Sequence, residues 1–122
     1  ESYQAKEIDF QHKVLMITVN NSVLERESVY EAVRHAWRLS KKKAEQAELV
    51  LAMQQGLVVG VFVPEKWLKA TPENFPGRPE RPKRWGFVGH EAPEDIAKLY
   101  LRTRLPDSMR KRGAANPVKY KL

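Results

Sequence analysis

The chain of 122 residues contains no cysteine. Disulfides, zinc sites with thiolate ligands, iron–sulfur clusters and a cysteine nucleophile are therefore excluded. No apolar run approaches the roughly 20 residues that cross a bilayer, and the first residues lack the charged and apolar regions of a signal peptide. We therefore expect a soluble, cytoplasmic protein with no membrane partner.

Sequence motifs typical of catalysis are also missing. There is no Gly-rich loop of the P-loop or dinucleotide-binding type and no Gly-x-Ser-x-Gly elbow. The histidines His12, His35 and His90 match no metal-binding spacing. A metal-dependent nuclease needs converging carboxylates with a nearby lysine, and the chain holds only scattered pieces of such a site, at residues 64–66 and 106–107. We expect no metal and no cofactor, and a non-enzymatic role is favoured, although an enzyme stays open.

The length of the chain limits the number of domains, and its charge indicates the kind of partner. One compact domain over residues 1–122 is the default for this length. The 22 Lys and Arg outnumber the 15 Asp and Glu, which gives a formal net charge of +7 and a pI near 9.8. This excess favours a polyanionic partner such as nucleic acid, but many basic proteins have no such partner.

Apolar runs predict the centre of a sheet. Residues 13–19 form a partly β-branched run that indicates a buried strand. Residues 48–53 and 57–63 are two further runs, joined by Gln54-Gln55-Gly56, and they predict a hairpin beside the first strand. Pro64 is expected to end the second strand of this hairpin, because proline cannot donate to a central ladder.

The remaining segments predict helices, a loop and two outer strands. Ser28 and Glu31 have the spacing of a capping box, so we expect a helix that begins at Ser28 and continues to about Ser40. A Pro-rich loop is expected at about 70–84. Residues 1–12 are expected to be an irregular arm or edge strand, with a strand at 84–89, a helix at 93–101, a helical turn at 107–112 and a last strand at 117–122. The predicted fold class is α+β, a small mixed sheet or β pseudo-barrel with two to three helices in the order β-α-β-β-loop-β-α-β.

Positive charge is gathered into three clusters, each beside a large aromatic residue. Basic side chains neutralise phosphates and aromatic faces stack on bases, so this combination predicts a nucleic-acid surface. The third cluster lies in a basic C-terminal segment at 102–122 around Tyr120. The candidate nucleic-acid-binding residues are Arg34, Trp37, Arg38, Lys41, Lys42, Arg81, Lys83, Arg84, Trp85, Arg110 and Arg112.

Each cluster also has a purely structural interpretation. On the expected helix, Arg34, Arg38 and Lys41 form a stripe, which is also typical of a solvated helix face near its C-terminus. Trp37 shares the apolar side of that helix, so core packing is favoured for it, and the same holds for Trp67 after the hairpin. Trp85 follows the Pro-rich loop and a run of cations, and the two interpretations are balanced for it.

The stretch from Ala47 to Phe62, with Trp67 and the later Arg84-Trp85-Gly86-Phe87, resembles the hairpin and return strand of PUA-like domains, including the EVE and ASCH branches. The resemblance covers about half of the chain. It implies a small pseudo-barrel that binds RNA or modified bases in DNA, with a base held in a pocket between the barrel and a helix. It further implies that Trp37 or Trp85 lines this pocket and that the basic clusters grip the flanking phosphates.

Three functional hypotheses follow from these features. The first is a non-catalytic module that binds DNA or RNA through its basic clusters and tryptophans. The second is an interaction subunit that binds an acidic protein partner, for example in a toxin, phage or restriction assembly. The third, less favoured, is a hydrolase built on His90 and Glu91.

Overall fold

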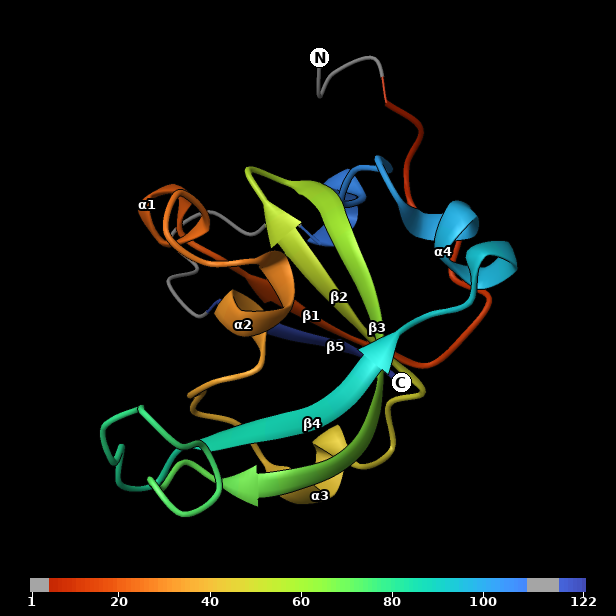
Figure 1. The fold of residues 1–122 in the computed structure, drawn as a ribbon. Helices are drawn as coiled ribbons and strands as arrows, with labels where there is room; N and C mark the ends of the chain where they lie inside the picture. The colour runs from red at the N-terminus through yellow and green to blue at the C-terminus, as the bar shows by residue number, and fades with distance from the viewer. Residues whose placement is uncertain (1–4, 110–116) are drawn as a thin grey trace.

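The computed structural model describes residues 5–109 and 117–122. The fold is α+β, with one mixed five-stranded sheet in the strand order β4-β3-β2-β1-β5 and short helices around it (Figure 1). The strands are β1 (Val14–Thr18), β2 (Leu49–Gln54), β3 (Leu57–Lys69), β4 (Trp85–Glu91) and β5 (Val118–Lys121). The sheet is open, and β4 and β5 are its edges among the described strands.

The three inner strands are those that the apolar runs predict. β1 pairs in parallel with β2 and antiparallel with β5, and β2 pairs antiparallel with β3. Leu15 and Ile17 pack into one core cluster and Val14 and Met16 into the other, so both faces of β1 are buried. The hairpin between β2 and β3 is confirmed, and Gly56 adopts the positive φ of 81° that its tight turn requires.

Helices cover both faces of the sheet. The elements α1 (Asn21–Leu24), α2 (Val29–Val33) and α3 (Lys41–Ala44) come from the segment between β1 and β2 and pack on one face. The other face is covered by α4 (Glu94–Tyr100), with the fully buried Tyr100, and by the N-terminal segment around Ile8. The short helix η2 (Asp107–Met109) follows. No helix within residues 5–109 and 117–122 is long and apolar enough to span a bilayer.

The expected end of the hairpin at Pro64 is wrong. β3 continues through Pro64 to Lys69 and pairs with β4 along this extension. A bulge between Pro64 and Lys66 interrupts the ladder where proline cannot donate, and Gly89 lies opposite Pro64. Any side chain at position 89 would clash, because an added Cβ would lie 2.1 Å from the Val63 carbonyl oxygen.

The extension turns β3 and β4 into an arm that leaves the rest of the sheet. Figure 1 shows this two-stranded arm, with the connecting loop at its tip and α3 beside it. The loop, residues 70–84, contains turns and no helix or strand, as its prolines predict. Phe75 is fully buried in this loop and anchors it. The arm and its loop carry one of the predicted basic clusters.

Candidate nucleic-acid interface

The expected helix from Ser28 to Ser40 is correct at its start and wrong at its end. Ser28 caps α2 and accepts a hydrogen bond from the Glu31 N–H at 3.1 Å, as the capping box predicts. The helix nevertheless stops at Val33. The indole Nε1–H of Trp37 donates to the Val33 carbonyl at 2.7 Å, which satisfies one acceptor at the helix end. Arg34, Arg38 and Lys41 therefore do not form a stripe on one helix.

Backbone pairing with the arm accounts for this early stop. The Trp37 N–H donates to the Trp85 carbonyl at 2.8 Å, and the Trp85 N–H donates back to Trp37 at 2.9 Å. The Phe87 N–H donates to the Arg34 carbonyl at 2.8 Å. These bonds place the first predicted basic cluster directly beside the second, although 48 residues separate the two tryptophans.

The short helix α3 carries cations on two aromatic rings. Lys41 Nζ lies 5.6 Å from the centre of the Trp85 ring, and Lys43 Nζ lies 5.4 Å from the centre of the Tyr120 ring. The Ser40 N–H donates to the Tyr120 hydroxyl at 3.1 Å, which fixes β5 against the same segment. The first two predicted clusters and the described part of the third, residues 117–122, thus meet at α3.

We use the name basic surface for this assembly. It consists of Arg38, Lys41, Lys42, Lys43, Arg81, Lys83 and Arg84 with the rings of Trp85 and Tyr120. Five of its cations are exposed to solvent, and Lys41 and Arg84 are half-buried. These residues come from three separate segments of the sequence, 38–43, 81–85 and residue 120.

A hollow of about 350 Å³ lies within the basic surface, at the tip of the arm. We call it the loop hollow. It is lined by Lys69, Ala70, Thr71, Glu80, Arg81, Pro82, Lys83, Arg84 and Trp85. Four of the predicted nucleic-acid-binding residues therefore share one concave site, which contains a single carboxylate and four cations. Its floor is held by hydrogen bonds from the Arg81 N–H to Ala70 at 2.9 Å and from the Ala70 N–H to Arg84 at 3.1 Å.

Arg34 lies elsewhere and is packed inward. Its guanidinium carbon is 5.2 Å from the centre of the Tyr30 ring and 5.1 Å from that of Phe75. Its Nε lies 3.7 Å from a Glu31 carboxylate oxygen, too far for a hydrogen bond. In this position Arg34 ties α2 to the anchor of the loop.

Arg78, which belongs to the second basic cluster of the sequence, has the same structural role as Arg34. Its Nη2 donates to the Glu31 carbonyl at 2.8 Å and to the Glu31 carboxylate at 3.1 Å, and it lies 3.3 Å from a Glu27 carboxylate oxygen. The loop is thereby clamped to α2. A single arginine within a Pro-rich segment carries no local signal that could predict this clamp.

His35 sits between these arginines. Its ring meets Phe75 edge to face at 4.9 Å between centroids. Burial lowers the pKa of His35 from 6.5 to about 4, and the nearby positive charges of Arg78, Arg34 and Arg81 act in the same direction. His35 is therefore neutral at pH 7 and does not add to the positive charge of the surface.

The other predicted residues are placed as follows. Trp37 is half-buried and packs against the core, and Trp67 is only 5% exposed, so the favoured core interpretation is confirmed for Trp67. Trp85 is half-buried too and packs against the same core cluster, and it also contributes to the lining of the loop hollow. Arg110 and Arg112 lie outside the described residues.

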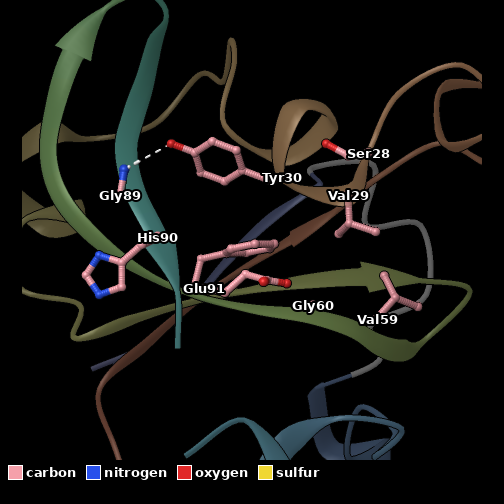
Figure 2. Close-up of a pocket in the computed structure, with 9 residues that line it drawn as sticks. Ser28, Val29, Tyr30, Val59, Gly60, Gly89, His90 and Glu91 are labelled. Atoms are coloured by element: carbon pink, nitrogen blue, oxygen red, sulfur yellow. Dashed lines mark hydrogen bonds between the residues drawn. The ribbon is translucent and has the colours of Figure 1, made fainter. Parts of the chain in front are cut away.

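A second hollow lies between α2 and the strands β3 and β4 (Figure 2). We call it the α2 pocket. Its volume is about 470 Å³ and its lining residues are Ser28, Val29, Tyr30, Val59, Gly60, Phe62, Gly89, His90 and Glu91. The Tyr30 hydroxyl accepts a hydrogen bond from the Gly89 N–H at 3.1 Å, drawn in Figure 2. Neither Trp37 nor Trp85 lines this pocket.

The arrangement gives little support to a hydrolase. His90 Nδ1 is paired with a Glu65 carboxylate oxygen at 2.9 Å, and both side chains are more than half exposed to water. Catalytic pairs are usually desolvated, so this exposed pair is typical of a surface contact. No group of three acidic or histidine side chains that could hold a metal ion occurs in residues 5–109 and 117–122.

No protein-family model matches this chain, and comparisons with curated proteins and with solved structures gave no match either. The function is therefore inferred from the geometry of the basic surface and of the two hollows.

Proposed function

We propose that this protein is a non-catalytic nucleic-acid-binding module whose basic surface holds the phosphate backbone and whose Trp85 stacks on a base. One observation carries the proposal: segments 37–43 and 81–85, each basic and aromatic, are joined through the Trp37–Trp85 backbone bridge into one surface. Cations beside an accessible aromatic ring are what binding of single-stranded nucleic acid requires.

The position of Lys41 supports a specific mode of binding. The Lys41 ammonium group lies over the Trp85 ring, 5.6 Å from its centre. A base that stacks on this ring takes the place of Lys41, and the displaced ammonium group then pairs with a phosphate of the same strand. The loop hollow beside the same ring supplies Arg81, Lys83 and Arg84 for the neighbouring phosphates. Lys42 and Lys43 on α3 extend the path toward Tyr120.

We also propose a PUA-like relationship, with the described strands forming an open sheet, and a cytoplasmic location. The segments that carry the resemblance, β2, β3 and β4, are neighbours in the sheet, and α2 covers one side of them. This arrangement is compatible with the proposed relationship.

An acidic protein is the second candidate partner. The exposed cations Arg38, Lys42, Lys43, Arg81 and Lys83 offer a charged surface to any polyanion. The partial exposure of Trp85 beside them favours nucleic acid, because stacking needs an accessible ring face.

The test is a titration of tryptophan fluorescence with short single-stranded and duplex DNA and RNA at two salt concentrations. We expect saturable quenching that weakens as salt rises, with Trp85→Ala removing most of the signal. Lys83→Ala is expected to weaken binding, whereas Lys98→Ala on α4, which packs on the opposite face of the sheet, is the matched control and leaves binding unchanged. Absence of binding to all four nucleic acids at low salt would overturn the proposal and turn attention to a protein partner.

A further inference from the structure

The loop hollow collects positive charge that no carboxylate neutralises. Its four cations are Lys69, Arg81, Lys83 and Arg84. None of them forms an ion pair within residues 5–109 and 117–122, although the Glu80 carboxylate also lines the hollow. Arg78 of the same loop, by contrast, is paired with two glutamates. Cations gathered without partners repel one another, so an anion bound among them is favoured.

Lys83 is held in a backbone conformation that lysine rarely adopts, with a φ of 63°. The Arg84 N–H donates to the Arg81 carbonyl at 3.2 Å and closes a four-residue turn with Pro82 second and Lys83 third. The third position of a turn with positive φ favours glycine, because a side chain makes the left-handed conformation less stable. A lysine at this position therefore indicates a role for the side chain and not for the turn.

The hollow also offers a neutral donor. The Thr71 hydroxyl oxygen accepts a hydrogen bond from the Asn74 N–H at 3.3 Å and keeps its own proton to donate. Among the four cations, Arg84 makes one long side-chain hydrogen bond, from Nη1 to the Ala36 carbonyl at 3.4 Å. Guanidinium, ammonium and hydroxyl groups together are the side chains with which proteins bind phosphate oxygens.

The charge and the shape of the hollow suit the end of a strand better than its middle. A phosphate diester within a strand carries one negative charge and is bonded to a nucleoside on each side. A phosphate monoester at an end carries a charge of about −1.5 to −2 near pH 7 and has three free oxygens. Four cations in one concave site favour the more highly charged group. In a hollow of about 350 Å³, a terminal phosphate brings only one attached nucleoside.

We infer that the loop hollow binds a phosphate monoester, and that this group is the phosphorylated end of a nucleic-acid strand. Arg81 and Lys83 pair with the phosphate oxygens, and the terminal base stacks on Trp85, which lines the same hollow. This inference rests on the proposed function, because Trp85 holds the base next to the phosphate. Inorganic phosphate has the same chemistry without the base, and the experiment separates the two.

The experiment measures binding of one single-stranded sequence that carries a 5′-phosphate, a 3′-phosphate or only hydroxyl ends. The readout is fluorescence anisotropy, with a dye at the end that is not varied. A hydroxyl-ended strand two nucleotides longer has about the same total charge and is the matched ligand. We expect one of the two phosphorylated strands to bind about tenfold more tightly than this longer strand. Inorganic phosphate is expected to bind far more weakly, and binding as tight as that of the phosphorylated strand would overturn the assignment to a strand end.

Lys83→Gly is the decisive variant, since glycine adopts a φ of 63° without strain. Its melting temperature is expected not to fall, while the tenfold preference for the phosphorylated end is lost. Arg102→Gly is the matched control. Arg102 is also an exposed cation, its φ is 65°, and it follows α4 on the opposite face of the sheet, so this variant keeps the preference.

Three results would overturn the inference: equal binding of the phosphorylated and the longer hydroxyl-ended strands, a preference that persists in Lys83→Gly, and an equal loss of preference in Arg102→Gly. Salt-dependent binding of strands without a preference for a phosphorylated end would overturn only this inference. Failure of every strand to bind would overturn the proposed function.

Discussion

Acidification between pH 6.5 and 4 is predicted to destabilise the protein through His35. The pKa of this histidine falls from 6.5 to about 4 on folding, chiefly through burial of its ring beside Phe75 and then through Arg78 and Arg34. Because the folded pKa is the lower one, the unfolded chain binds more protons between these two pH values. The contribution of neutral His35 to stability is therefore complete above pH 6.5 and is lost as the pH falls to about 4.

The magnitude follows from the two pKa values. A difference of one in pKa corresponds to about 1.36 kcal/mol, so a fall from 6.5 to about 4 gives an upper figure of about 3 kcal/mol. The ring is only half-buried, and water screens part of this effect. We expect His35 to account for about 1–3 kcal/mol of the free energy of unfolding.

Urea unfolding at pH 7 and pH 4 measures this contribution in the wild type and in His35→Phe. Phenylalanine keeps a ring against Phe75 and does not titrate, and the variant keeps every carboxyl group of the wild type. The wild type is expected to lose more stability on acidification than the variant, by the amount given above. Equal losses in the two proteins would refute the account of His35.

Two further predictions concern the arm and its loop. Phe75→Ala removes a fully buried ring that packs on His35 and Arg34, and it is expected to cost about 3–5 kcal/mol in urea unfolding. Phe10→Ala, at a half-buried ring, should cost clearly less, and equal costs would contradict the anchoring of the loop by Phe75. Gly89→Ala would place a Cβ 2.1 Å from the Val63 carbonyl oxygen, so we expect a loss of roughly 3 kcal/mol or more in thermal unfolding. Gly77→Ala, with no atom within 4 Å and a φ of 83°, is the control and should lose only about 1–2 kcal/mol, so equal losses would contradict close packing at the bulge.

The sequence predicts the inner strands well because their signals are local. Residues 13–19 and the hairpin around Gly56 are apolar runs with a turn residue at the required position. The error at Pro64 has a tertiary cause, since a bulge opposite Gly89 lets the strand continue past a residue that normally ends one. The helix that begins at Ser28 ends early for a similar reason, because Trp37 pairs with Trp85 of a distant strand.

At the candidate site, too, the sequence predicts the local features, whereas the contacts between distant segments are seen only in the structure. Basic residues beside Trp37 and Trp85 can be recognised from composition, but only the bridge between the two tryptophans shows that they form one surface. The residues that line the α2 pocket could not be predicted, because Tyr30, Phe62 and Glu91 come from three separate elements and no local pattern links them.

The most direct test of the basic surface is an NMR titration of the isotope-labelled protein with a short single-stranded oligonucleotide at low salt. We predict that the largest chemical-shift changes fall on the backbone amides of both segments, 37–43 and 81–85, and on the indole N–H of Trp85. All of these changes should saturate at the same oligonucleotide concentration. Residues of α4, on the opposite face of the sheet, should stay unchanged. Shifts confined to α4, shifts in only one of the two segments, or no shifts at all would contradict the account.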